Sequence, residues 1–329
     1  MDYIIFIFAL LFLVISGKYL VEGGVSIAIH FKIPKIIIGV TVIAFGTSAP
    51  ELLVSIQAAL SGNPEIAFGN VIGSNISNIA LVLAFTAILI PIPVHRNALR
   101  LDWPVMMVAS VLLYLFTLND VLGFYEGLIL LTLLMIYLYY SVNKAKKGGD
   151  KEQVDEKEKS QYTLVVSLVV IAVSSVGLAL GANFLVDSAV NIATDWGVSK
   201  RVISITIVAF GTSVPELTAS IIAAFKKQTD ISIGNILGSN ILNIMAVLGI
   251  TSMIQDIHID HIAFSFDIIW MIFGAILLFL FIYPFKTVYL NRVEGVLLFI
   301  SYIIYVSLVL TGIDFESISS SFDISHIFK

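Results

Sequence analysis

The chain has 329 residues, of which 58% are hydrophobic and only 12% are charged, and its mean hydropathy is +1.00. Soluble domains carry about 25% charged residues, so the composition excludes a soluble protein and indicates an integral protein of a lipid bilayer. The net charge of -5 does not suggest a nucleic-acid partner, and no protein partner can be inferred. The absence of Cys excludes disulfides and thiolate metal sites.

Ten apolar segments are long enough to span a bilayer, because about 20 helical residues cross about 30 Å of hydrocarbon. In chain order, we expect the spans at residues 2–29, 35–60, 66–90, 103–118, 122–142, 162–194, 201–225, 231–255, 262–283 and 288–313. The predicted fold class is therefore an all-α integral membrane protein with ten transmembrane helices.

A charged segment divides the ten spans into two sets of five. It contains the run KAKKGGDKEQVDEKEKS and is typical of a solvated linker. We therefore expect a first five-helix repeat at 1–142, the linker at 143–161, a second five-helix repeat at 162–313 and a polar tail at 314–329.

The basic residues predict the orientation of the chain. Fourteen of the 18 Lys and Arg residues fall in connections on the side of the linker, and three fall on the opposite side. Under the positive-inside rule, the linker is cytoplasmic and the N-terminus lies outside a multi-pass protein of the cell membrane (plasma or bacterial inner). Because each half has an odd number of spans, the second repeat enters the membrane inverted.

The two halves share a polar motif inside apolar spans. Residues 41–86 recur as residues 206–251 at an offset of 165, and 25 of the 46 aligned positions are identical. AFGTSAPEL returns as AFGTSVPEL, and GNVIGSNISNI returns as GNILGSNILNI. The same carboxylate, hydroxyls and amides in two inverted halves predict one two-fold site at mid-membrane, and this site should bind a cation.

Glu51 and its copy Glu216 are the acids of this motif. An ionisable residue at mid-membrane costs several kcal/mol and points to function. Ser48 and Ser213 offer an alternative, because each forms a capping-box pattern with the Glu three residues later. A helix start inside the bilayer is itself abnormal, however, since backbone facing lipid cannot be left unpaired.

Gly46 and Pro50 predict that the second span is broken into two half-helices. Broken helices at matching places in two repeats are typical of a transporter's substrate site. A half-helix that ends near Ala44 would turn its unsatisfied carbonyls toward the gap. Thr47 and Ser48 would add hydroxyl oxygens, and Glu51 would add a carboxylate.

Amides and a hydroxyl follow on the next span, where Asn70, Ser74 and Asn78 share one helix face. We expect four residues of this face and its copy to bind the ion: Ser74, Asn78, Ser239 and Asn243. For four further amides, ligation and interhelical hydrogen bonding remain equal alternatives: Asn70, Asn75, Asn235 and Asn240.

The resulting ligand set contains only oxygen, and none of the five His residues falls in the motif. Ca²⁺ and Na⁺ prefer such ligands, whereas zinc or copper would require imidazole or thiolate. Two carboxylates could neutralise one Ca²⁺ or two Na⁺, so the site suits competing ions. No nucleophile and base lie together in the motif and no cofactor motif occurs, so we expect neither an enzyme nor a bound cofactor.

The doubled GTS-x-PE and GN-x-x-GSN-I-x-N motifs resemble the α-repeats of the cation/calcium exchanger superfamily, in its sodium/calcium exchanger branch with bacterial and archaeal members. The resemblance covers all ten spans. It implies inverted repeats in which spans two, three, seven and eight surround the ions while the long first and sixth spans slide past them. By motif position it implies these ligands: carboxylates of Glu51 and Glu216, hydroxyls of Thr47, Ser48, Ser74, Thr212, Ser213 and Ser239, and carbonyls of Ala44 and Ala209.

One residue departs from the family pattern. Sodium/calcium exchangers often carry Asp where this chain has Asn243, so the site here has one carboxylate fewer. The predicted function is an antiporter that exchanges Ca²⁺ for Na⁺ by alternating access. A Ca²⁺/H⁺ exchanger is the nearest alternative because a buried Glu can carry protons, and a cation channel is the alternative from another class.

Overall fold

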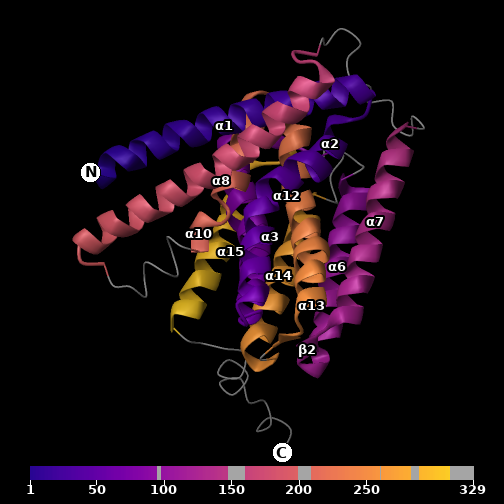
Figure 1. Ribbon diagram of the computed structural model, residues 1–329, viewed down its shortest axis with the longest axis vertical. Helices are drawn as coiled ribbons and strands as arrows, with labels where there is room; N and C mark the ends of the chain where they lie inside the picture. Colours follow the sequence, from indigo (N-terminus) through magenta and orange to yellow (C-terminus); the bar gives the residue numbers. More distant parts are fainter. Residues whose placement is uncertain (95–97, 147–159, 199–208, 260, 283–288, 312–329) are drawn as a thin grey trace, which may run out of the picture.

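The computed structural model describes residues 1–94, 98–146, 160–198, 209–259, 261–282 and 289–311. The described chain is almost entirely helical (Figure 1). Most of the predicted linker 143–161, the start of the predicted seventh span and the whole predicted tail 314–329 lie outside the described residues.

The helices follow the predicted spans closely. The first half contains α1 (Asp2–Phe31), α2 (Lys35–Ile38), η1 (Gly39–Ile43), α3 (Ala44–Leu60), α4 (Glu65–Ser77), η2 (Asn78–Leu83), α5 (Ala84–Leu89), η3 (Ala98–Asp102), α6 (Trp103–Phe116), η4 (Thr117–Asn119) and α7 (Phe124–Lys146). The second half contains α8 (Leu164–Asp195), α10 (Ala209–Gly211), α11 (Val214–Phe225), α12 (Thr229–Leu242), η6 (Asn243–Leu248), α13 (Gly249–Ile254), α14 (His261–Ile282) and α15 (Arg292–Thr311).

Within the described ranges, eight helical segments are long and apolar enough to cross a membrane. Two shorter apolar helices, Val214–Phe225 and Phe266–Ile282, fall in the predicted seventh and ninth spans. The all-α membrane fold predicted from the sequence is confirmed.

The spans differ in how deeply they are buried. The most apolar 18-residue window of Thr229–Ile254 is 94% buried, whereas that of Arg292–Thr311 is only 17% buried. Because both are apolar, this difference reflects position: the first packs at the centre of the bundle and the second presents apolar side chains to lipid. The span that carries the second polar motif is therefore the one most enclosed by protein.

Helices α1 and α8 form a long antiparallel pair at one side of the bundle (Figure 1). Glycines bring them together, since a Cβ at Gly181 would lie 2.9 Å from Leu13 Cγ and one at Gly23 would lie 2.8 Å from Ile171 Cγ1. As the residue number rises along α1 it falls along α8, which gives the pair its antiparallel sense.

The contacts of α12 show that the two repeats are inverted. A Cβ at Gly234 would lie 2.7 Å from the carbonyl oxygen of Ile36, and one at Gly238 would meet Val40, so α12 runs parallel to the second span. The turn at Lys226–Gln228 makes α11 antiparallel to α12. Helix α11 therefore runs opposite to its counterpart α3.

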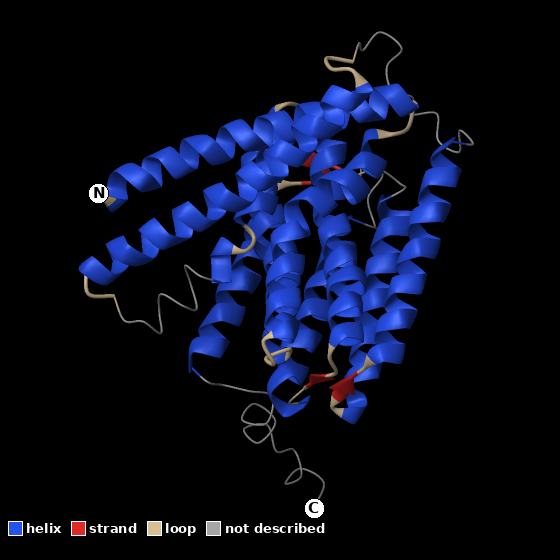
Figure 2. Cartoon of the chain, in the orientation of Figure 1, coloured by secondary structure: helices blue, strands red, loops and turns tan. Residues whose placement is uncertain are grey.

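Two short antiparallel strand pairs join the repeats, one at each end of the helical bundle (Figure 2). β1 (Ile92–Pro93) pairs with β4 (Tyr289–Leu290), and β2 (Val121–Leu122) pairs with β3 (Ile257–His258). Each pair connects a loop of the first repeat with a loop of the second, so the halves are fastened at both ends.

The predicted break in the second span is wrong for the first repeat. The helix continues from Lys35 to Leu60 through the π-helical segment η1, and Pro50 lies inside α3. Proline removes the single hydrogen bond to the carbonyl of Gly46, four residues earlier, and a surrounding bundle can absorb that loss. In the second repeat the break does occur, because Thr212 and the residue after it separate α10 from α11.

Candidate cation site

The polar motifs of the two repeats meet at the centre of the bundle. Thr47 Oγ1 donates to Asn235 Oδ1 at 3.1 Å, and Ser48 Oγ donates to Glu216 Oε1 at 3.0 Å. Both bonds join α3 to a helix of the second half. The side chains involved are buried, including Glu216 at 0% exposure.

A pair of hydroxyl contacts repeats across the two-fold axis. Thr47 Oγ1 lies 3.4 Å from Ser239 Oγ, and the equivalent Ser74 Oγ lies 3.4 Å from Thr212 Oγ1. The fold therefore brings together four of the six predicted hydroxyl ligands, two from each repeat.

The amides form a second symmetric pair of contacts. Asn78 Nδ2 donates to Asn240 Oδ1 at 3.2 Å, and the equivalent Asn243 Nδ2 donates to Asn75 Oδ1 at 3.2 Å. Asn75 also donates to the backbone oxygen of Asn240 at 3.2 Å. Asn75 and Asn240 therefore use their amides in hydrogen bonds between helices. Of their two possible roles, ion ligation and interhelical hydrogen bonding, the structure favours the second.

Both ends of the Asn235 side-chain amide are also hydrogen-bonded. Its Nδ2 donates to Ser220 Oγ at 3.1 Å, while its Oδ1 accepts from Thr47. The equivalent Asn70 makes a longer contact, 3.5 Å from its Nδ2 to Ser55 Oγ, and is only partly buried. The two positions are thus less symmetric than their sequences suggest.

Asn78 and Asn243 each begin a π-helical segment, η2 and η6 respectively. Single π-helical turns inside α-helices occur frequently at functional sites. The widened turn redirects a side chain without ending the helix. The sequence contains no signal for this feature, because π-turns have no residue pattern comparable to a cap.

The motif side chains that meet at the centre of the bundle are called the cluster. Six of its oxygens are buried and have no hydrogen-bond partner among the described residues. They are Glu51 Oε1, Glu51 Oε2, Glu216 Oε2, Asn78 Oδ1, Asn243 Oδ1 and Ser213 Oγ. An unsatisfied buried polar group costs about 1–3 kcal/mol, and more when it is charged. Each of the six is an oxygen acceptor of the type that Ca²⁺ and Na⁺ bind, so a hard cation suits them chemically.

The two carboxylates come from neighbouring helices, since Ser48, three residues before Glu51 in α3, donates to Glu216 Oε1 at 3.0 Å. Within the described part of the chain, no basic side chain forms an ion pair with either acid. When both acids are ionised, the cluster carries a negative charge that a bound cation would compensate.

The two predicted carbonyl ligands are the backbone oxygens of Ala44 and Ala209. Ala44 is fully buried, and its oxygen accepts from Thr47 Oγ1 at 3.2 Å. Ala209 is the first residue of α10, just before the break in the second repeat. The assignment of both carbonyls as ligands stays a prediction.

A cavity of about 160 Å³ reaches the cluster from the end of the bundle where α1 begins. Its lining includes Glu51, Asn70, Asn183, Asp187 and Thr212. The cluster is thus accessible from one end of the molecule.

The sequence analysis did not identify two further acids, the buried Asp102 and the partly buried Asp267. Asp102 Oδ1 accepts from the hydroxyl of Tyr137 at 2.8 Å, and Asp267 Oδ1 accepts from that of Tyr305 at 2.9 Å. The acids are equivalent at the offset of 165, and searching that offset beyond residues 41–86 would have found them. Each holds a tyrosine of a neighbouring peripheral helix, away from the cluster.

Inverted repeats that share a buried set of oxygen acceptors, with access from one end, are typical of secondary transporters. The chain belongs to the sodium/calcium exchanger family, which matches residues 1–143 and 166–311. The resemblance seen in the doubled motifs is therefore confirmed, and the chain is a member of a family of membrane ion exchangers.

Individual relatives extend over nearly the whole chain. The putative antiporter CaxA of Alkalimonas amylolytica is 37% identical, covering 90% of this chain and 94% of that protein. The sodium/calcium exchanger MaX1 of Methanosarcina acetivorans is 27% identical, covering 92% and 97%. A structure of the sodium-calcium exchanger NCX_Mj in 10 mM Na⁺ without Ca²⁺ has a TM-score of 0.78 and 33% identity, covering 93% of this chain and 98% of that one.

Proposed function

We propose that this chain is a secondary antiporter that exchanges Ca²⁺ for Na⁺ by alternating access at the central cluster. The observation that carries the proposal is the set of six buried oxygens, drawn from both repeats, that have no partner in the described part of the chain. The proposed ligands are the carboxylates of Glu51 and Glu216, the amide oxygens of Asn78 and Asn243, and the neighbouring hydroxyls and carbonyls.

The charge of the cluster supports this choice of ions. Two carboxylates balance one Ca²⁺ or two Na⁺, so either cargo leaves the site neutral. Mg²⁺ suits the site less, because it gives up its water reluctantly and requires a strict octahedral geometry. A site that two ions can fill in turn, but not together, is what exchange requires.

Proton coupling is the rival within the same class. Asn243 replaces the Asp that sodium/calcium exchangers often carry, so this site has one negative charge fewer for Na⁺. Glu51 and Glu216 are both 2% exposed or less and could take up protons in exchange for Ca²⁺. Sodium is preferred here because two of the similar proteins, MaX1 and NCX_Mj, are named sodium/calcium exchangers.

The membrane orientation belongs to the same proposal. The distribution of the basic residues supports an N-terminus outside the cell and a cytoplasmic linker. The cavity beside Glu51 would then open to the outside, and Ca²⁺ would move outward against entering Na⁺.

The test is ⁴⁵Ca²⁺ uptake into proteoliposomes that contain the purified protein. With Na⁺ inside and none outside, we expect rapid, saturable uptake, and no comparable uptake under an imposed pH gradient without Na⁺. Uptake driven only by the pH gradient would make the protein a Ca²⁺/H⁺ exchanger. Uptake that needs no ion on the opposite side would indicate a channel.

A further inference from the structure

A second pair of acids recurs between the repeats, outside the motif that identifies the family. The triplet Leu-Val-Glu that ends at Glu22 in α1 returns as Leu-Val-Asp ending at Asp187 in α8, at the same offset of 165. Both acids line cavities. Because α1 and α8 are antiparallel, the two cavities lie toward opposite ends of this helix pair.

The cavity beside Asp187 is called the N-terminal mouth. Asp187 is exposed and has no ion-pair partner within the described ranges. Glu51 lines the same cavity and is only 2% exposed, and neither of its carboxylate oxygens has a hydrogen-bond partner among the described residues. Asn183, one helical turn before Asp187, adds a further oxygen to the lining. An exposed carboxylate therefore stands at the entrance to a buried one.

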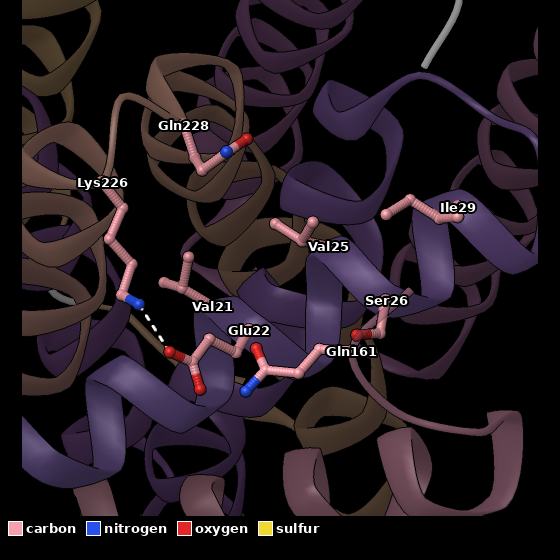
Figure 3. Close-up of a pocket in the computed structure, with 8 residues that line it drawn as sticks. All are labelled: Val21, Glu22, Val25, Ser26, Ile29, Gln161, Lys226 and Gln228. Carbon is pink, nitrogen blue, oxygen red and sulfur yellow. Dashed lines mark hydrogen bonds and ion pairs between the residues drawn. The ribbon is translucent and has the colours of Figure 1, made fainter. Parts of the chain in front are cut away.

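The cavity beside Glu22 is called the linker mouth and has a volume of about 330 Å³ (Figure 3). Both carboxylate oxygens of Glu22 have partners. Lys226 Nζ lies 2.6 Å from Glu22 Oε1, and the hydroxyl of Tyr162 donates to Glu22 Oε2 at 3.0 Å. Ser26, Gln161 and Gln228 complete the polar part of the lining.

The two mouths differ in a way that the sequence explains. The position equivalent to Lys226 in the first repeat is Ser61, and no base lines the N-terminal mouth among the residues that the structure describes. The linker mouth also stops short of the cluster, because Glu216 does not contribute to its lining. In this conformation one mouth reaches a cluster carboxylate and keeps its acid free, while the other is closed and its acid holds an ammonium group.

We propose that Asp187 and Glu22 form two entrance sites for the transported cation, one at each mouth, and that Lys226 occupies the Glu22 site while the linker mouth is closed. The proposal rests on the exchange function proposed above. Each acid attracts a hard cation from solution and passes it to the cluster. Opening the linker mouth separates α1 from the end of α11, which frees Glu22 for the cation.

The expected effect is moderate, because the entrance acids are partly solvated. A carboxylate several ångströms from a dication raises the local cation concentration by roughly threefold to tenfold at low salt. Screening weakens this attraction as the ionic strength rises. Loss of an entrance acid should therefore raise the KM for Ca²⁺ at one face only, and less so in high salt.

The experiment compares right-side-out and inverted membrane vesicles that carry the same protein. Initial ⁴⁵Ca²⁺ uptake is measured against Ca²⁺ concentration, with Na⁺ inside the vesicles. Asp187→Asn should raise the KM about threefold or more in one vesicle orientation and leave the other unchanged. Asp195→Asn is the matched control, because Asp195 is an exposed acid on the same helix that does not line the cavity.

The linker mouth is tested in the opposite vesicle orientation. Lys226→Gln should lower the KM there by freeing Glu22, and adding Glu22→Gln to that variant should raise it again. Equal KM values for the single and double variants, or an Asp187→Asn effect that is absent or equal at both faces, would overturn the proposal. Failure of wild-type exchange in the same vesicles would instead refute the proposed function.

Discussion

Replacing Glu51 or Glu216 with glutamine tests the cluster most specifically, because it removes a charge and preserves the shape of the side chain. Glu51 has no hydrogen-bond partner to lose among the described residues. At position 216, the glutamine carbonyl can still accept from Ser48, which donates to Oε1 at 3.0 Å in the native chain. Both variants should therefore fold and insert.

The effect on the bound ion should be large. At an effective dielectric constant of about 20, a carboxylate and Ca²⁺ about 2.4 Å apart interact by roughly 14 kcal/mol before desolvation is subtracted. If only a tenth of this survives as net binding, the loss is about 1.4 kcal/mol, or about tenfold in affinity. If a third survives, the loss is about 4.7 kcal/mol, or more than a thousandfold in affinity, which abolishes transport at ordinary Ca²⁺ concentrations.

The assay is Na⁺-driven ⁴⁵Ca²⁺ uptake into proteoliposomes, with size-exclusion chromatography and thermal unfolding as controls for folding. We expect each variant to be monodisperse, at least as stable as the wild type without Ca²⁺, and inactive. A helix-capping role would give the opposite result, because glutamine also serves a capping box. Transport near the wild-type rate by either variant would refute the two-carboxylate site.

Three further predictions concern the surroundings of the site. Asn243→Asp adds a third acid, so transport should survive with altered Ca²⁺ affinity and a steeper pH dependence; if this variant and Asn243→Ala both behave as wild type, the residue only packs. Gly234→Ala should destabilise the fold by about 1–3 kcal/mol in thermal unfolding, because its Cβ would lie 2.7 Å from a backbone oxygen, whereas Gly274→Ala, with open space at that position, should not. In this Cys-free chain, a cysteine at Lys146 should be shielded from impermeant maleimide in intact cells while one at Gly62 is labelled, and the reverse would invert the orientation.

The fold could be predicted closely from the sequence because hydropathy reports directly on burial in lipid. The predicted first span at 2–29 corresponds to α1 at Asp2–Phe31, and the predicted sixth span at 162–194 corresponds to α8 at Leu164–Asp195. Inversion followed from the odd number of spans in each half. These features depend on composition and length, which a sequence carries in full.

The interior of the site was predicted less completely. Pro50 suggested a break, but the first-repeat helix continues through a π-helical segment, because a single lost hydrogen bond is tolerated in a packed bundle. The ambiguous amides Asn75 and Asn240 could be assigned only from the structure, since their partners lie on helices of the opposite repeat. Such pairings depend on the register between helices, which a single sequence does not specify.

The central claim is that the two repeats build one shared cation site rather than one site each. Equilibrium binding of ⁴⁵Ca²⁺ to the purified protein, with and without competing Na⁺, tests this directly. We predict one Ca²⁺ bound per chain, displaced by Na⁺, and no high-affinity binding in either Glu51→Gln or Glu216→Gln. Two Ca²⁺ per chain, with each substitution removing only one of them, would contradict the shared site.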